Sequence, residues 1–340
     1  MYSLRNDYSE GAHPKILEAL TATNTTQEEG YGEDSYSAEA ERLIKAFFNA
    51  PGADIHFVSG GTQANLLVIA SMLKPWESVI APETGHIFIH EAGAIEATGH
   101  RISTIPTKDG KITPEGIKAV VNAHTDEHMV LPKMVFISNS TELGTVYSGA
   151  ELKAIRKVCD ELNLYLYLDG ARLGSALASD SNLSPEDLTK YTDVFYVGAT
   201  KNGALLGEAI IINNDLFKEN FRFNMKQRGA LLAKGRLTGI QFQELFRNDL
   251  FLENARHANA MAAQLAAVIR DCGYSFLTDP VSNQLFVIFP DKIITALEKE
   301  FAFYTWSRID ELHSSVRLVT SWATKQELVD DFSALLKRIS

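Results

Sequence analysis

The sequence lacks most features that mark secreted, membrane or metal-binding proteins. It contains only two cysteines, Cys159 and Cys272, and their separation suits neither a disulfide framework nor a metal-ligand motif. We expect free thiols in a reducing compartment. No apolar run approaches membrane-spanning length, and the N-terminus MYSLRNDYSEGAHP has no apolar core of the kind that signal peptides carry. A soluble, cytoplasmic protein with no membrane partner is the expectation.

Basic residues are also in the minority. The 340 residues include 32 Lys and Arg against 43 Asp and Glu, which gives a formal net charge of −11. No basic patch stands out, so nucleic acid is not an expected partner. The phosphate-loop pattern GxxxxGK and the dinucleotide pattern GxGxxG are both absent. These absences argue against a nucleotide-binding α/β protein, which stays open as an alternative.

What the chain does contain is a regular alternation of strands and helices over residues 50–212. That pattern predicts an α/β domain with a mainly parallel sheet flanked by helices. Residues 274–340 show the α+β pattern of a smaller domain. Because the length favours two domains, we expect a large α/β domain with an N-terminal arm over residues 1–245 and a small α+β domain over residues 246–340.

Several local elements can be assigned within this frame. The strands are expected near residues 55–59, 78–81, 134–137, 164–168, 194–197 and 208–212. Ser37 is predicted to cap a helix over Ala38–Phe48, and His90–Gly99 is predicted to form a helix. One or two long helices are expected over residues 238–270.

Two charged residues follow buried strands in the central stretch. Asp169 ends an apolar strand, and Lys201 follows another strand between Gly198 and Gly203. Ligands of open α/β sheets bind at the carboxyl ends of strands. A lysine and a carboxylate placed there suit pyridoxal phosphate (PLP), which needs an amine for its Schiff base and an acid partner for its ring nitrogen. The alternative is that Asp169 caps a turn and Lys201 is a surface lysine.

Further polar residues follow other strands. Gly60, Gly61 and Thr62 lie between a strand and a helix, an arrangement that can bind an anion. His86 follows a strand and could stack on a flat cofactor, although a lone histidine is more often structural. Arg317 lies in an apolar strand, where it is either half-exposed or directed at an anion.

Together these stretches resemble a known family. LRNDY near the start, YGED at 31–34, SGGTQANL at 59–66, His86 with HEAGA, LDGARLG at 168–174, ATKNG, KQRGALLAKG at 226–235 and VRLVTSWAT at 316–324 are similar to motifs of the PLP-dependent threonine aldolases. That family belongs to the fold type I, aspartate aminotransferase-like group. The resemblance covers nearly the whole chain, and LDGAR with a downstream lysine and an upstream GTQAN is a specific combination.

The resemblance implies a role for each matching residue. Lys201 would hold the cofactor covalently, Asp169 would pair with its ring nitrogen, and His86 would stack on the ring. Gly61 and Thr62 would bind the phosphate. The remaining expected site residues would bind the substrate carboxylate (Arg172, Arg317), reach the phosphate from a neighbouring subunit (Lys226 or Arg228) or lie near the site (Tyr31).

Two positions depart from the commoner family pattern. Asn6 stands where a serine is usual near the substrate carboxylate. The ENTH motif reads Ser138-Asn139-Ser140-Thr141, so a histidine expected near the substrate hydroxyl is missing, and Thr141 or Glu142 could substitute. The departures bear on side-chain specificity more than on the cofactor.

The resemblance implies retro-aldol cleavage of L-threonine, L-allo-threonine or related β-hydroxy-α-amino acids to glycine and an aldehyde. His86 is the first candidate base and Glu142 the second. β-Elimination or transamination on the same scaffold, or a scaffold without activity, are the alternatives. The family also implies a homo-oligomer with shared sites, at least a dimer and more typically a tetramer.

Overall fold

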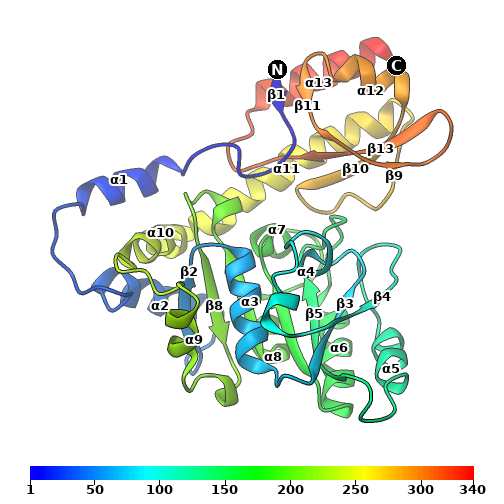
Figure 1. The fold of residues 1–340 in the computed structure, drawn as a ribbon. Coiled ribbons are helices and arrows are strands. Elements are labelled where there is room, and N and C mark those ends of the chain that lie inside the picture. Colours follow the sequence, from blue (N-terminus) through cyan, green and yellow to red (C-terminus); the bar gives the residue numbers. More distant parts are fainter.

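The computed structural model of the chain describes residues 1–340 and is built around a seven-stranded sheet of order β2-β8-β7-β6-β5-β3-β4 (Figure 1). The strands are β2 (Asp54–Val58), β3 (Glu77–Pro82), β4 (Ile102–Ile105), β5 (Leu131–Ser138), β6 (Tyr165–Asp169), β7 (Val194–Gly198) and β8 (Glu208–Ile212). β8 runs antiparallel to both neighbours, and every other neighbouring pair is parallel. The prediction of a mainly parallel α/β sheet is confirmed.

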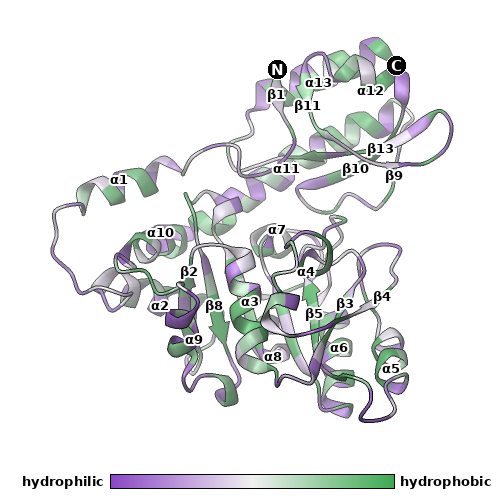
Figure 2. Cartoon of the chain, in the orientation of Figure 1, coloured by the Kyte–Doolittle hydropathy of each residue, from purple (hydrophilic) through white to green (hydrophobic).

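Successive residues of the central strands pack into two different hydrophobic clusters, as the two-residue period of a strand requires. Leu168 and Phe195 belong to the cluster on one face, whereas their chain neighbours Tyr167 and Tyr196 belong to the cluster on the other. Figure 2 shows the resulting hydrophobic strands, for example β5 and β8. The sheet is therefore buried on both sides.

Different helices cover the two faces. α3 (Gly61–Met72) and α9 (Phe221–Gln227) contribute to the cluster that contains Tyr167. The opposite cluster contains residues of α1 (Pro14–Ala22), α2 (Ser35–Phe47), α5 (Pro114–Asn122), α6 (Gly149–Glu161), α8 (Pro185–Tyr191) and α10 (Arg236–Phe246). We call these the α3 face and the α6 face of the sheet.

A third cluster belongs to a smaller four-stranded sheet of order β12-β13-β10-β9. Its strands are β9 (Ser275–Phe276), β10 (Gln284–Pro290), β12 (Tyr304–Arg308) and β13 (His313–Val319), and its helices are α11 (Leu250–Asp271), α12 (Asp291–Leu297) and α13 (Gln326–Ile339). β1 (Tyr2–Ser3) pairs with β11 (Phe301–Ala302), so the chain begins beside this unit (Figure 1). The predicted domain boundary after residue 245 stays a prediction; it falls at the end of α10.

Two local predictions were wrong. Asp34, and not Ser37, caps α2, because the Asp34 carboxylate accepts the backbone N–H of Ser37 at 2.8 Å. His90–Gly99 is not a helix: α4 spans only His86–Ile89, and Ala92 and Gly93 then adopt φ values of 49° and 76°. Left-handed residues of this kind interrupt an α-helix. The expected helices over residues 238–270 are confirmed as α10 and α11.

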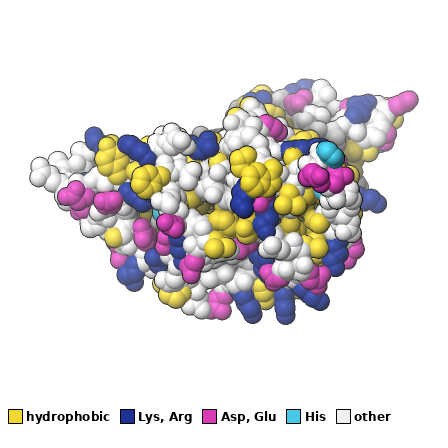
Figure 3. All heavy atoms as spheres, turned by 60° about the horizontal axis from the view of Figure 1, so that its bottom comes forward, with side chains coloured by type: hydrophobic (Ala, Val, Ile, Leu, Met, Phe, Trp, Pro, Cys, Tyr) yellow, Lys and Arg dark blue, Asp and Glu magenta, His cyan; other side chains and the backbone are white.

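The surface and the cysteines agree with the composition. Acidic and basic side chains are interspersed on the face drawn in Figure 3. Cys159 and Cys272 are both free thiols. None of the helices combines the length and hydrophobicity that crossing a membrane would require.

Candidate active site

A cavity of about 280 Å³ lies at the edge of the large sheet where β2, β5, β6 and β7 end. The predicted site residues that line it are Gly61, Thr62, His86, Glu142, Asp169, Arg172 and Lys201. They come from distant parts of the chain and meet because the parallel strands end at the same edge. The structure therefore brings the central part of the predicted site together.

Asp169 lines this cavity and is held as a hydrogen-bond acceptor. It ends β6 and is 3% exposed. Its carboxylate accepts the Tyr196 hydroxyl at 2.5 Å, the backbone N–H of Ala171 at 3.0 Å and the side-chain amide of Asn65 at 3.2 Å. With three donors around it, the carboxylate has a fixed orientation and can hold a proton on a partner nitrogen.

Lys201 is held on a short 3₁₀ helix, η2 (Thr200–Asn202), directly after β7. The next residue, Asn202, donates to the carbonyl of Phe251 at 2.8 Å, and its own carbonyl accepts from Asn254 at 2.9 Å. Burial and the nearby charge of Arg172 lower the pKa of Lys201. A larger fraction of its amine is therefore unprotonated at neutral pH, as a nucleophilic lysine requires.

The N-terminus of α3 forms the anion-binding side of the cavity. Gly60 is its N-cap and provides no capping side chain, so the first N–H groups of the helix are available to a ligand. Gly61 is required by packing, since a Cβ there would lie 2.9 Å from the Tyr196 hydroxyl oxygen. The hydroxyl-bearing residues Thr62 and Thr200 line the same space.

His86 is oriented by a chain of hydrogen bonds that sequence reasoning missed. Its Nδ1 lies 2.8 Å from Oε1 of buried Glu91, which also accepts the side-chain amide of Asn65 at 2.6 Å. The Tyr167 hydroxyl donates to Asn65 at 2.8 Å. Burial alone would lower the pKa of His86, but the hydrogen bond to Glu91 and the charge of Asp169 outweigh it, and the pKa is raised. Glu91 and Asn65 thus link His86 to Asp169.

Glu142 lines the cavity next to His86. Its Oε1 accepts the Ser138 hydroxyl at 2.7 Å and the backbone N–H of His86 at 2.9 Å, whereas its buried Oε2 has no partner. Burial, helped by the charge of Asp169, raises the pKa of Glu142. Thr141, the other predicted substitute, does not line the cavity, and its hydroxyl is 2.7 Å from that of Thr145.

Arg172 joins the cavity to the N-terminal arm and the small unit. Its guanidinium donates to both oxygens of buried Asp7, at 2.7 and 3.0 Å, and Asn283 donates to the same carboxylate at 2.9 Å. Burial would raise the pKa of Asp7, but the charge of Arg172 overcomes this and lowers it. Nε and Nη2 of Arg172, the pair that could bind a carboxylate, are therefore already bonded to Asp7. Sequence reasoning missed Asp7.

Arg317 does not line the cavity itself. It lies on β13 with its guanidinium 5.5 Å from the ring centre of Trp306, and it donates to the Arg5 carbonyl at 3.1 Å. Its Nε is buried without a partner. Burial, together with the charge of Arg172, lowers the pKa of Arg317, which indicates that the two guanidinium groups are close.

The other predicted residues also lie outside the cavity that holds Lys201. The Asn6 side chain accepts from Tyr8 and Ser9 within the N-terminal arm. The ammonium of Lys226 lies 4.7 Å from the ring centre of Tyr31, and Arg228 is exposed at the end of α9.

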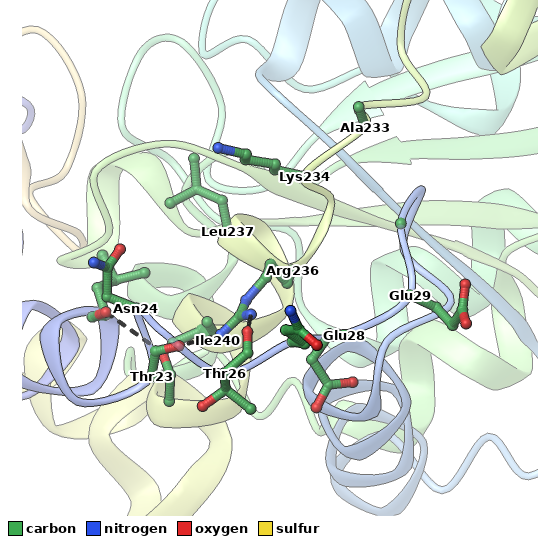
Figure 4. A pocket seen from close by; sticks show the side chains of 13 residues that line it. Thr23, Asn24, Thr26, Glu28, Glu29, Ala233, Lys234, Arg236, Leu237 and Ile240 are labelled. Carbon is green, nitrogen blue, oxygen red and sulfur yellow. Dashed lines mark hydrogen bonds between the residues drawn. The ribbon is translucent and has the colours of Figure 1, made fainter.

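A larger cavity lies elsewhere. It measures about 980 Å³ and is bounded by residues 20–30 and 233–240 (Figure 4). Arg236 reaches across it and donates to the carbonyls of Thr23 and Thr26. None of the predicted site residues lines this cavity, and it offers no lysine–carboxylate–imidazole set.

The smaller cavity has the donor set that PLP needs. A lysine of lowered pKa, a fixed carboxylate, an imidazole and an uncapped helix N-terminus face one space. These groups supply respectively the covalent attachment, the ring-nitrogen partner, the stacking group and the phosphate site. The residues present fit this cofactor.

Comparisons with known proteins agree with this geometry. Residues 3–292 match the model of the β-eliminating lyase family. A low specificity L-threonine aldolase of Pseudomonas aeruginosa is 34% identical over 96% of this chain and 95% of its own. A solved Leishmania major threonine aldolase has 49% identity and a TM-score of 0.98 over 99% of both chains. A Thermus thermophilus aspartate aminotransferase variant, at 17% identity and a TM-score of 0.73 over 100% of this chain and 92% of that one, shares the fold. The chain therefore belongs to the β-eliminating lyase family and, within it, to the threonine aldolases.

Proposed function

We propose that this protein is a PLP-dependent aldolase that cleaves L-threonine, L-allo-threonine or related β-hydroxy-α-amino acids to glycine and an aldehyde. The observation that carries the proposal is the meeting of Lys201, Asp169 and His86 in one cavity beside an uncapped helix N-terminus. When bound, PLP would supply an electron sink for the bond that breaks at the substrate Cα. The protein residues supply attachment, orientation and proton transfer.

Lys201 and Asp169 would hold the cofactor and control its charge. The amine of Lys201, whose pKa is lowered by burial and by Arg172, would form the covalent link to the cofactor. Asp169 would keep a proton on the ring nitrogen, because Tyr196, Asn65 and the Ala171 N–H hold its carboxylate in place. The N–H groups at the start of α3 and the Thr62 hydroxyl would bind the phosphate.

The substrate carboxylate is assigned to Arg317 with help from Arg172. The partnerless Nε of Arg317 supports this assignment, whereas two nitrogens of Arg172 already donate to Asp7. Fixing the carboxylate sets which bond of the substrate stands ready to break. An Arg317→Ala variant would then raise KM and lower kcat together, and wild-type kinetics would remove Arg317 from the site.

His86 is the first candidate for the group that takes the β-hydroxyl proton, directly or through water. Glu91 occupies its Nδ1, which leaves Nε2 for the substrate. Glu142 is the second candidate, supported by its partnerless Oε2. His86→Gln and Glu142→Gln variants distinguish the two candidates. The base is the residue whose replacement abolishes the fall of kcat at low pH.

A homo-oligomer is part of the proposal, a dimer at least and a tetramer by the family pattern. Tyr31, Lys226 and Arg228 would reach the cavity of a neighbouring copy, which would account for their position outside the cavity of their own chain. Mixing Lys201→Ala subunits with Arg228→Ala subunits should restore part of the activity that each variant lacks alone. No recovery in mixed oligomers would contradict shared sites.

We also assign the protein to the cytoplasm, where Cys159 and Cys272 would remain reduced. The reaction itself is tested by product analysis with L-threonine and added PLP. Glycine and acetaldehyde should form in equal amounts. Formation of 2-oxobutyrate and ammonia would indicate β-elimination instead, and formation of an amino form of the cofactor with a keto acid would indicate transamination.

A further inference from the structure

Glu208 is a buried acid at the same sheet edge for which the proposed reaction has no use. It is 4% exposed and is the first residue of β8. Because β8 runs antiparallel to its neighbours, its first residue lies where β2 and β7 end, opposite Val58 and Gly198. β2 leads into the N-terminus of α3, and β7 leads to Lys201. Glu208 thus lies between the phosphate end and the lysine end of the cavity.

The Glu208 carboxyl group is only half satisfied by the protein. Its Oε1 accepts the Thr200 hydroxyl at 3.2 Å, whereas its buried Oε2 has no hydrogen-bond partner. Glu208 lines the cavity together with Gly61 and Thr62. A buried polar atom without a partner is costly, so the free oxygen points to a ligand that completes it.

The charges around Glu208 decide its protonation state. The titratable groups that face it are Lys201 on η2, Asp169 and Tyr167 on β6, and Tyr196 on β7. The cavity-lining residues between the end of β2 and the first turn of α3, residues 59–62, are uncharged, and the other titratable groups that line the cavity are Tyr8, His86, Glu142 and Arg172. Burial, opposed by Lys201 and reinforced by Asp169, raises the pKa of Glu208 to about 8. The neutral acid therefore dominates at neutral pH.

A neutral acid in this position has a specific use. An ionised carboxylate would repel a phosphate dianion at the start of α3, whereas a protonated one offers an O–H donor on its free oxygen. We propose that Glu208 is a binding residue for the cofactor's phosphate and that, as a neutral carboxylic acid, it donates a hydrogen bond to a phosphate oxygen. This inference rests on the proposed function, since that function supplies the phosphate.

The inference is tested by binding of pyridoxine 5′-phosphate, which has the phosphate and the ring but no aldehyde and so cannot react with Lys201. The cofactor-free full chain is titrated calorimetrically at pH 8 in two buffers of different ionisation enthalpy. Wild-type protein should take up about half a proton more than Glu208→Gln, because about half of Glu208 is ionised before binding at that pH. Its affinity should also fall up to about tenfold per pH unit above pH 8, whereas that of Glu208→Gln should not.

Matched variants separate this role from a structural one. Glu77→Gln changes another buried glutamate of the sheet, outside the cavity, and should behave like the wild type. Glu208→Ala removes the donor and should weaken binding about tenfold at pH 7. Equal proton uptake and equal pH dependence in wild type and Glu208→Gln would overturn the inference.

A second measurement needs no variant. Difference infrared spectra of the wild type should gain the carbonyl absorption of a protonated carboxylic acid when pyridoxine 5′-phosphate binds at pH 8. Loss of that absorption, or no change, would overturn the role of Glu208 while leaving the aldolase proposal intact. If the wild type did not bind pyridoxine 5′-phosphate at all, the proposed function would fail and this inference with it.

Discussion

The two faces of the large sheet are built from the same strands and differ sharply at one edge. On the α6 face, Leu168, Phe195 and Ala209 are fully buried apolar residues. Their immediate chain neighbours on the α3 face are Asp169, Tyr196 and Glu208, all polar and all lining the cavity. In each strand, adjacent residues therefore lie on opposite faces, one in the apolar core and the other in the wall of the cavity.

The difference shows how a buried polar site can exist without loss of the fold. The α6 face supplies uninterrupted apolar burial. On the α3 face many polar groups bond to one another, as Tyr167 does to Asn65 and Tyr196 to Asp169, and Oε2 of Glu208 is left for a ligand. Substitutions on the two faces should consequently have opposite profiles: loss of activity on the α3 face and loss of stability on the α6 face.

The largest loss of activity is expected for Lys201→Ala, in the cavity. Removal of the amine should lower kcat at least about 10⁴-fold, because no other residue of the cavity offers a nucleophilic amine. Acetaldehyde release from L-threonine measures this. Binding of pyridoxine 5′-phosphate should survive, which shows that the site remains folded; substantial residual turnover would contradict the assignment.

Asp169→Asn should follow, with kcat lowered by about 10²–10³-fold, the range seen when one preorganised electrostatic partner is lost. The amide keeps the size of the side chain but cannot hold the ring proton. Steady-state kinetics at saturating PLP measures the effect. A change in KM alone would show that Asp169 acts in binding and not in the chemical step.

Phe195→Ala tests the α6 face. Phe195 is fully buried and packs edge-on against Phe48 at 5.0 Å between ring centres, so truncation should lower the free energy of unfolding by about 3–5 kcal/mol. Denaturant unfolding measures this, and kcat/KM of the folded fraction should stay near the wild-type value. Tyr196→Phe, one residue along, is the matched control and should lose activity with a smaller loss of stability.

Glu91→Gln should give the smallest effect, a shift in pH dependence. The hydrogen bond to Glu91 raises the pKa of His86, so His86 loses its proton at a higher pH than an ordinary histidine. Without the Glu91 charge the pKa of His86 should fall, and the acid limb of the pH profile of kcat/KM should move to lower pH. An unmoved limb, with folding intact, would remove His86 from the role of base.

Sequence reasoning found the residues that follow buried parallel strands and missed those placed in other ways. Asp169, Lys201, His86 and the Gly61–Thr62 turn could be predicted because an apolar run that ends in polar residues marks a sheet edge. Glu208 could not, because it begins its strand and lies at the same edge only through the antiparallel direction of β8.

Glu91 was missed for a different reason. We expected a helix over His90–Gly99, which would have placed Glu91 in its first turn. Instead, the left-handed residues Ala92 and Gly93 prevent a helix there, and Glu91 contacts His86. Asn65 and Tyr167 read as ordinary helix and strand residues. Their hydrogen bonds depend on tertiary packing, which no local sequence pattern predicts.

The most direct test of the account is to locate the cofactor on the chain. The protein is incubated with PLP, reduced with borohydride to make the lysine link permanent, digested and analysed by mass spectrometry. The account predicts one modified residue, Lys201, and no modification when glutamine replaces it. A modified lysine elsewhere, or no modified lysine, would contradict the claim that the cavity lined by Lys201 and Asp169 is the active site.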